Sequence, residues 1–363
     1  MERGLYIATT GLLHNQRRLD VISNNMANVN TTGYKKDAVV AESFPDLLLQ
    51  RVNDTSFNFR QAPQAPTTVN FLKAETENSY NVDIDAAFLR VETPFGVSHN
   101  KNLQFTVDND GYLKTFYRMN GAVKTNNENY VLGKNGRVQV PGGPGATIEV
   151  DGQGNLLADG AIIDNLIFTP ATNVIGTINS GVREDKVVTN FTQGTMIDTG
   201  NKLDLALKGD GFIKVHTDKG DYYTRDGSFS LSKTGELVTR EGGYPVGKVG
   251  SIAANTEQVS INEYGEIIAD GKIVDKIEIV DITNKEDLRK IGNNFYKIVD
   301  GQTAQETPFK GSLMQGYLEG ANVNPVQEMV DMISVMRSYE TSQKVVKAFD
   351  EMLAKSVNEI PKL

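Results

Sequence analysis

The chain has no cysteine, no tryptophan and only three histidines among its 363 residues. Without cysteine, disulfide bridges and thiolate chemistry are excluded. The histidines lie far apart in the sequence, at His14, His99 and His216, so a histidine-rich metal site is not expected. An aromatic content of 8% indicates several small cores, and the length predicts roughly two to three domains.

Long apolar runs and an excess of positive charge are also missing. No stretch approaches the ~20 apolar residues that span a bilayer, so membrane insertion is not expected. Charged and polar side chains interrupt the first twenty residues, so we expect no cleaved Sec signal. A net charge of −9 argues against nucleic acid, because binding to phosphates needs a basic surface.

Motifs that would indicate catalysis or cofactor binding are absent as well. The glycine-rich segments 142–145 and 209–211 lack the Lys-Ser/Thr that follows a phosphate-binding loop. Residues 108–111 hint at a calcium loop, but its first and twelfth positions would be Thr106 and Tyr117, so we favour a hairpin turn. We therefore expect no catalytic residues, no cofactor and no metal, and interpret the chain as a non-enzyme.

A helix is predicted over about residues 2–28, because apolar and small residues recur every three or four positions. This first stripe consists of Leu5, Ala8, Leu12, Asn15, Leu19, Ile22, Met26 and Val29. The helix should end before the segment Asn30-Thr31-Thr32-Gly33-Tyr34, where Asn and Gly permit left-handed backbone.

A second helix is predicted from Pro325 to about Val357. Asn324 can cap it, Pro325 suits the first helical position, and Gln327 completes a capping-box-like spacing. Its stripe consists of Val326, Met329, Ile333, Met336, Tyr339, Ser342, Val346, Phe349 and Leu353. The two stripes predict long terminal helices paired as a coiled coil, which favours assembly over catalysis.

The middle of the chain alternates like short strands, so the predicted fold class is α+β, with mainly antiparallel β domains between the helices. Asp110-Gly111, Asn135-Gly136 and Asp226-Gly227 are predicted hairpin turns. Residues 37–87 show no clear period, include the proline-containing segment 61–66, and are predicted to form an extended connector.

An internal repeat is also present. Residues 148–164 resemble residues 259–275, with a constant offset of 111 residues, as from Gly154 to Gly265. Chance likeness between glycine-rich turns is the alternative. We predict a terminal helical domain (1–36 plus 321–363), a connector (37–87), an inserted β module (88–172) and a related β domain (173–320).

Several segments resemble flagellar rod and hook proteins. Residues 5–12 and 19–35, which include Asn28-Val29-Asn30-Thr31-Thr32-Gly33-Tyr34-Lys35, are similar to the N-terminal signature of that family. Residues 181–212 and 223–229 resemble its β domain, and the segments 318–324, 328–330, 337–340 and 349–353 resemble its C-terminal signature. Residues 88–172 depart from the shorter members, and the ending 350–360 is more similar to basal-body rod proteins than to hook proteins.

The resemblance implies a structural subunit of the bacterial flagellar basal-body rod, located in the cell envelope. Such a subunit is exported by the flagellar type III apparatus and self-assembles through its terminal helices. The resulting helical tube transmits torque and conducts exported subunits. The implied partners are further copies, other rod and hook proteins, the export apparatus, and the bushing rings or cell wall around the rod.

Subunit contacts are expected along the two stripes and at the asparagines that end the first one. The expected interface residues are Leu5, Leu12, Leu19, Ile22, Asn24, Asn25, Met26, Asn28, Val326, Met329, Ile333, Met336, Tyr339, Val346, Phe349 and Leu353. The alternatives are an internal antiparallel helix pair in a monomer and, for the asparagines, solvated helix-end positions.

Three other functions stay open at this point. One is a flagellar hook subunit. Another is a secreted β-rich adhesin, which would need a groove lined by several aromatic residues, whereas Tyr222-Tyr223 is the only adjacent tyrosine pair. The third is a peptidoglycan hydrolase fused to a rod protein, which would need a catalytic Glu or a Cys/His arrangement in a separate helical domain.

Overall fold

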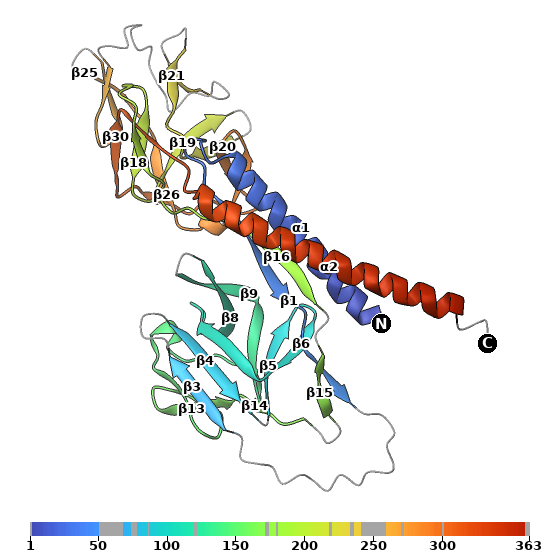
Figure 1. Cartoon of the computed structure of the whole chain (residues 1–363). Helices are drawn as coiled ribbons and strands as arrows, with labels where there is room; N and C mark the ends of the chain where they lie inside the picture. Colours follow the sequence, from blue (N-terminus) through green and yellow to red (C-terminus); the bar gives the residue numbers. More distant parts are fainter. Residues whose placement is uncertain are drawn as a thin grey trace, which may run out of the picture. The chain divides into compact units, whose positions relative to one another are not determined.

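The structure is a computed structural model that describes residues 2–50, 68–73, 78–85, 87–119, 122–170, 174–178, 181–217, 220–232, 236–240, 259–269, 272–299 and 301–359. The proline-containing segment 61–66 and the dipeptide Asp270-Gly271 of the repeat lie outside the described residues. The chain divides into two compact units (Figure 1). Unit 1 comprises Met1–His14, Val40–Asp185 and Thr341–Leu363, and unit 2 comprises Asn15–Val39 and Lys186–Glu340.

Four elements run through both units. They are α1 (Glu2–Ala27), β1 (Asp37–Ser43), β16 (Val182–Thr189) and α2 (Pro325–Glu359), and β1 pairs with β16. Both helices lie within a residue or two of the predicted ranges. Neither is long and apolar enough to cross a membrane.

Unit 1 is built on a nine-stranded sheet in the order β14-β5-β9-β8-β7-β4-β3, with β6 on β5 and β10 on β9. Separate small sheets are β11-β12-β13 and β15-β2. Its elements are β2 (Leu47–Gln50), β3 (Val69–Lys73), β4 (Ser79–Ile84), β5 (Phe88–Thr93), β6 (Gly96–Asn100), β7 (Asn102–Val107), β8 (Leu113–Met119), β9 (Ala122–Gly133), β10 (Gly136–Arg137), a 3₁₀ turn (Gly143–Gly145), β11 (Ile148–Val150), β12 (Asn155–Ala158), β13 (Ala161–Asn165), β14 (Ile167–Phe168) and β15 (Val174–Ile178).

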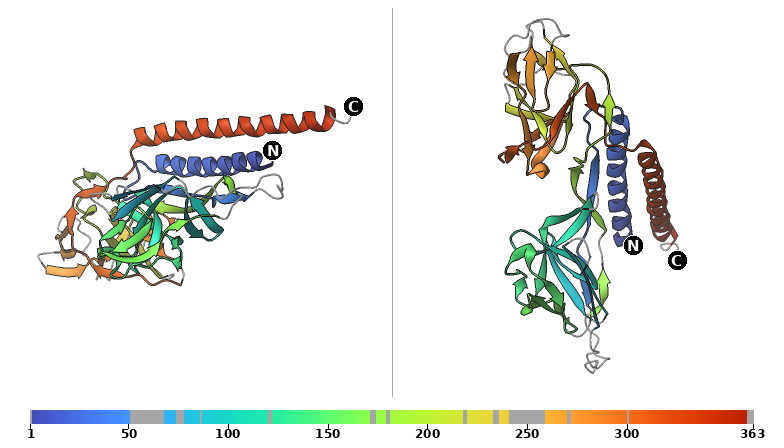
Figure 2. Two further views of the ribbon diagram at one scale, coloured as in Figure 1. Left: turned by 90° about the horizontal axis from the view of Figure 1, so that it is seen from below. Right: turned by 90° about the vertical axis from the view of Figure 1, so that its left-hand side faces the viewer.

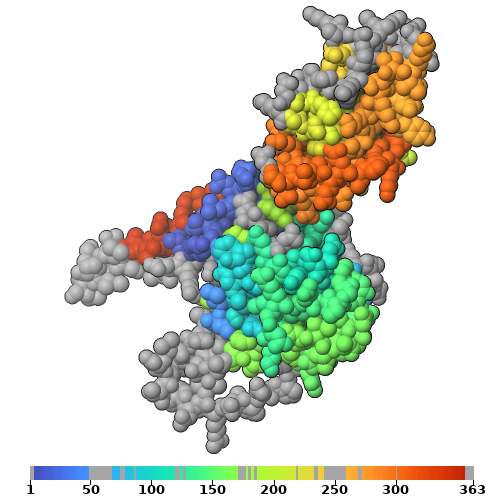
Figure 3. Space-filling view, turned by 180° about the vertical axis from the view of Figure 1, so that it is seen from behind, coloured from blue at the N-terminus to red at the C-terminus, as the bar shows by residue number. Residues whose placement is uncertain are grey.

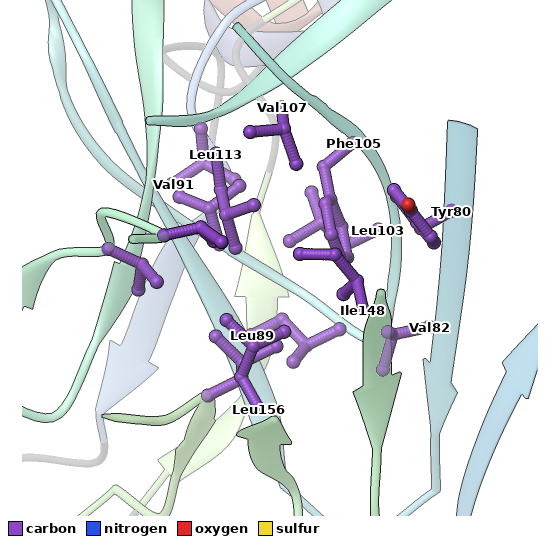
Figure 4. Close-up of a cluster of buried hydrophobic side chains, with 14 of the residues drawn as sticks. Tyr80, Val82, Leu89, Val91, Leu103, Phe105, Val107, Leu113, Ile148 and Leu156 are labelled. Atoms are coloured by element: carbon purple, nitrogen blue, oxygen red, sulfur yellow. The ribbon is translucent and has the colours of Figure 1, made fainter. Parts of the chain in front are cut away.

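A hydrophobic core packs two of the sheets of unit 1 together (Figure 4). Leu89 and Val91 are buried on β5 and alternate with partly exposed neighbours, which is the period of a half-buried strand. Ile148 and Leu156, from the small sheet, pack into the same cluster as Phe105 of the large sheet. The strands that share this cluster belong to the part of unit 1 that is cyan to green in Figure 3. The sheet already begins at β3 and β4, within the predicted connector.

Unit 2 contains a six-stranded sheet in the order β27-β28-β20-β19-β26-β29, together with the small sheets β17-β31, β18-β30, β21-β22 and β23-β24-β25. Two buried clusters support it, one around Phe229 and Ile267 and one around Phe212 and Tyr296. Its elements are β17 (Met196–Asp198), β18 (Leu205–Lys208), β19 (Phe212–Thr217), β20 (Gly220–Thr224), β21 (Phe229–Leu231), β22 (Leu237–Thr239), β23 (Val259–Ile261), β24 (Glu266–Ala269), β25 (Lys272–Lys276), β26 (Ile279–Ile282), a 3₁₀ turn (Lys285–Asp287), β27 (Leu288–Gly292), β28 (Phe295–Ile298), β29 (Glu306–Pro308), β30 (Ser312–Gln315) and β31 (Tyr317–Glu319).

The internal repeat is confirmed at the level of three strands. Ile148 pairs with Ala158, and Val259 pairs with Ala269, so the register is the same at the 111-residue offset. Both sheets carry a register irregularity at the same place, between Leu156 and Leu157 in one and between Ile267 and Ile268 in the other. A common origin of the whole segments 88–172 and 173–320 stays a prediction.

The expected fold class, with long helices paired as a coiled coil, is wrong. Strands make up most of the regular structure, and α1 and α2 are the only α-helices among the described residues. Within each unit the helix segments lie side by side (Figure 2), and the contacts between them include polar and small residues. Asn15 Nδ2 donates to Ser338 Oγ at 3.0 Å, and a Cβ on Gly4 would lie 2.5 Å from the Phe349 ring.

Two of the three predicted hairpin turns are confirmed. Asp110-Gly111 joins the paired strands β7 and β8, and Asn135-Gly136 joins β9 and β10. The third prediction, Asp226-Gly227, is wrong, because β20 pairs with β19 and β28 whereas β21 pairs with β22. The dipeptide links two different sheets.

Phe105→Ala should destabilise unit 1 by about 3–5 kcal/mol, because it opens a cavity in a fully buried site. Hydrogen exchange of strands β4, β5 and β7, measured with and without urea, would detect this loss. Leu72→Ala, on the same sheet but 65% exposed, is the matched control and should change protection little. Equal losses in both variants would contradict the assigned core.

Candidate subunit interface

The turn after α1 packs tightly against residues 225–226 within unit 2. Gly33 has φ +67°, and a Cβ there would lie 2.5 Å from the backbone nitrogen of Asp226. The Gly33 N–H donates to the carbonyl oxygen of Glu319 at 2.7 Å, and Thr32 Oγ1 donates to Asp226 Oδ1 at 2.8 Å. Glycine is therefore required at position 33 by both its backbone conformation and the close approach.

A buried cluster of charges follows at once in the sequence. Lys35 Nζ lies 2.6 Å from Glu319 Oε1, and Arg225 Nη1 lies 3.3 Å from Glu319 Oε2. The three side chains are at most 1% exposed. Lys35 Nζ also donates to the Thr192 carbonyl at 2.8 Å, and the Gly194 N–H donates to Glu319 Oε1 at 2.8 Å. Burial lowers the pKa of Lys35, although the Glu319 carboxylate acts in the opposite direction.

Asn25 forms a second set of internal bonds. Its Oδ1 accepts the Asp37 N–H at 2.9 Å and the Tyr34 hydroxyl at 3.1 Å. Its Nδ2 donates to the Asp37 carbonyl at 2.9 Å and to Glu328 Oε2 at 3.3 Å. Burial raises the pKa of Tyr34, and the carboxylates of Asp37 and Glu328 raise it further. Asn25 thus joins α1, β1 and the first turn of α2.

Side-chain hydrogen bonds also hold the start of α2. Asn322 Oδ1 accepts the Lys36 N–H at 2.7 Å, and its Nδ2 donates to the Asn190 carbonyl at 2.8 Å. Asn324 Oδ1 accepts the N–H groups of Val326 and Gln327, which confirms it as the helix cap. We call these polar residues the junction: Asn25, Tyr34, Lys35, Lys36, Arg225, Glu319, Asn322 and Glu328.

A cavity of about 140 Å³ lies beside the junction, lined by residues such as Arg18, Ile22, Lys36 and Asp331. It is smaller than the usual 300–1,000 Å³ of a ligand pocket. No group of His, Asp and Glu side chains in the described part of the chain is arranged to hold a metal ion. The junction itself is a network of buried ion pairs and hydrogen bonds.

An exposed apolar stripe runs along the first third of α2. This outer stripe comprises five residues that are 49–64% exposed: Val326, Met329, Val330, Ile333 and Met336. Glu328 and Val335, at 3% and 1% exposure, face inward. At 3.6 residues per turn, the outer stripe lies on the opposite side of the helix from these two residues.

The remaining predicted interface residues differ in exposure. Asn25 and Ile22 are buried, Asn24 is exposed, and Leu353 is 38% exposed; the partly buried residues are Leu5, Leu12, Leu19, Met26, Asn28, Tyr339, Val346 and Phe349. Their roles between subunits stay predictions. The spacing argument missed exposed apolar residues beside the stripes, namely Tyr6, Ile7, Leu13 and Val330. It also missed Lys35, Arg225 and Glu319, which carry no periodic signal.

A second charged cluster lies at the surface of the six-stranded sheet of unit 2. His216 Nδ1 lies 2.6 Å from Asp221 Oδ1, and His216 Nε2 lies 2.9 Å from Glu278 Oε2. Lys214 Nζ lies 3.1 Å from Asp221, 3.6 Å from Glu278 and 3.0 Å from Glu306. The hydrogen bonds to Asp221 and then to Glu278 raise the pKa of His216 above 6.5.

The charge of His216 should therefore stabilise unit 2 in a pH-dependent way. Because its folded pKa is raised, the contribution is complete below pH 6.5 and is lost as the pH rises through the folded pKa. The free energies of unfolding of wild type and His216→Gln, measured with urea from below pH 6.5 upward, should converge as the pH rises. Asp221→Asn should weaken the same dependence. A difference that grows with pH would contradict this assignment.

For the buried cluster, Glu319→Gln should cost about 3–5 kcal/mol, because it leaves Lys35 and Arg225 buried without their carboxylate. Lys35→Met should cost less, because Arg225 and Glu319 still compensate each other. Hydrogen exchange of β18 and β19, followed against urea, would measure both losses. A larger loss for Lys35→Met than for Glu319→Gln would show that the cluster is balanced differently.

Comparisons with known proteins match the segments that build the junction. The family model for "Flagella basal body rod protein" matches residues 5–35. The model for "Flagellar hook protein FlgE/F/G D1 domain" matches residues 206–269, and that for "Flagellar basal body rod FlgEFG protein C-terminal" matches residues 314–360. The first and last of these ranges contain Asn25, Lys35, Glu319 and Glu328.

Curated relatives indicate the same family as the family models. The chain is 33% identical over 189 residues to the flagellar basal-body rod protein FlgG of Buchnera aphidicola subsp. Acyrthosiphon pisum, covering 49% of this chain and 73% of the relative. It is 34% identical over 185 residues to FlgF of Caulobacter vibrioides, covering 50% and 75%. It is 27% identical over 372 residues to FlgG of Bacillus subtilis, covering 99% of both. The chain therefore belongs to the flagellar basal-body rod and hook family, as a rod-type structural subunit located in the flagellar basal body.

Proposed function

We propose that this subunit polymerises through its terminal helices into a helical tube, which transmits torque and conducts exported subunits. Its partners would be further copies and other rod and hook components, and its delivery would use the flagellar type III export apparatus. The FlgG relatives favour a place in the distal rod. A hook subunit is the alternative, because one matching model includes hook proteins. In this role the chain needs no catalytic residue.

The outer stripe of α2 is the observation that carries the proposal. Five apolar side chains stand about half exposed or more along three turns of one helix. Burying apolar surface is worth about 25 cal/mol per Å², so covering this stripe would favour association. A contiguous exposed apolar stripe on a folded protein commonly marks a protein–protein contact.

The junction supports a role in carrying load along the chain. It fixes the first turn of α2 and the end of α1 to the β structure of unit 2 through buried ion pairs and hydrogen bonds. Breaking one partner of a buried ion pair is costly, so the helix ends resist displacement. A subunit built in this way would pass force from its helices to its β structure.

The proposal assigns different segments of the chain to different layers of the tube. Residues 1–36 and 321–363 would form the axial layer of the tube, and residues 37–87, 88–172 and 173–320 would lie outside it. The interface residues predicted from the two stripes would then contact neighbouring subunits, except where a side chain such as that of Asn25 already bonds within its own chain.

Ile333→Asp should abolish polymerisation while both units still fold. Ile333 is 54% exposed, so the change leaves the core intact but places a charge where assembly removes water. The measurements are sedimentation and electron microscopy of the purified protein, together with motility of a strain that carries the change. Ser334→Asp adds the same charge to an exposed neighbour outside the stripe and serves as the control. Normal polymers of Ile333→Asp would rule out the stripe as an interface.

A further inference from the structure

An aromatic patch lies on unit 1, beside the first of the two stripes that the sequence singles out. The ring of Tyr6 on α1 lies 6.2 Å from that of Phe44, which lies 6.1 Å from that of Phe95. Tyr6 is 50% exposed and Phe95 is 51% exposed, and the neighbouring Ile7 is 44% exposed. We call the three aromatic residues, Tyr6, Phe44 and Phe95, the aromatic patch.

The Phe95 ring is held in place. It occupies the turn between β5 and β6, where Thr93 Oγ1 accepts the Phe95 N–H at 3.3 Å and donates to the Gly96 carbonyl at 2.8 Å. The guanidinium of Arg183 stacks 4.0 Å from the centre of the ring. Arg183 is itself held by Glu42 and Glu128, at 3.6 and 3.8 Å. A large apolar side chain is thus displayed to solvent by a preorganised set of partners.

The helical side of the patch is equally fixed. Gly181, at the start of β16, has φ +112°, and a Cβ there would collide with Thr10 Oγ1 of α1. The Gly181 carbonyl accepts the Phe44 N–H at 2.9 Å. The first turns of α1 therefore rest directly on the β1–β16 backbone, which sets Tyr6 beside Phe44 without requiring a partner to order them.

We propose that the aromatic patch of one copy binds the outer stripe of α2 in a second copy. The inference rests on the proposed polymerisation and names the surface that the stripe meets. An open helical polymer needs two different, complementary surfaces on each subunit. The patch is aromatic, whereas the stripe is aliphatic and contains Met329 and Met336, whose thioethers make favourable contacts with aromatic rings.

A consequence concerns the segment 88–172. Phe95 belongs to it, so this segment supplies a subunit contact and does more than add bulk to the outside of the tube. The β5–β6 turn would then be a specific part of the interface that shorter family members lack.

Engineered cysteines test the contact cleanly, because the chain has none of its own. Full-length Phe95→Cys protein with one tag is mixed with full-length Met336→Cys protein with another, and a short bismaleimide is added. Each copy carries a single thiol, so a mixed-tag dimer reports contact between copies. The control pair is Phe95→Cys with Lys272→Cys, an exposed position in unit 2.

The mixed-tag product should exceed the control more than about tenfold, because contact raises the effective concentration of the thiols to the mM range. If the yield of the mixed-tag product does not exceed that of the control pair, the proposed contact is wrong. If wild type still sediments as a polymer and Ile333→Asp does not, the proposed function stands and only this inference fails. If wild type does not polymerise but the cross-link forms, the pairwise contact stands and the helical tube fails. If neither occurs, both are wrong.

Discussion

The carboxylate of Glu319 is the constraint on which the arrangement of the chain's ends depends. It is buried with two cations, Lys35 and Arg225, and also accepts the Gly194 N–H. Each of these groups comes from a different part of the sequence, and each would be costly to bury alone. A buried ion pair is weak evidence of net stability, but it tolerates few alternative arrangements. The turn after α1, the loop at 192–194 and β31 are therefore specified together.

The junction also explains why apolar side chains remain outside. Glu328 uses the inward face of the first turn of α2 to bond Asn25 and Lys36, and Val335 continues that face. Polar and small residues mediate the approach of α1, as at Asn15 and Gly4. The apolar residues of α2 that do not fit this face are thereby left at the surface as the outer stripe.

The sequence predicted features that depend on nearby residues. It did not predict which face of a helix packs against its own chain. The two helix ranges, the turn at Gly33, the Asn324 cap and the three-stranded repeat depend on nearby residues, and the structure confirms them. The coiled-coil prediction failed because α2 carries apolar residues on two sides, and periodicity does not say which side meets its own chain. Asp226-Gly227 favours a hairpin locally, but its tertiary bond with Thr32 places it between two sheets. The Glu319 cluster joins residues up to 284 positions apart, which a single sequence does not reveal.

The two copies of the repeat share their local geometry and fill two different cores. In its two copies, Gly154 and Gly265 take nearly the same φ, +77° and +81°, and Asp151 and Asn262 accept the equivalent backbone N–H groups of Asn155 and Glu266. The repeated strands contribute Ile148 and Leu156 to one core and Val259 and Ile267 to another. Each copy also leaves an apolar side chain at the surface at the equivalent position, because Ile162 is 65% exposed and Ile273 is 64% exposed. The same local geometry therefore gives both copies the same division into a face that fills a core and a face that meets solvent.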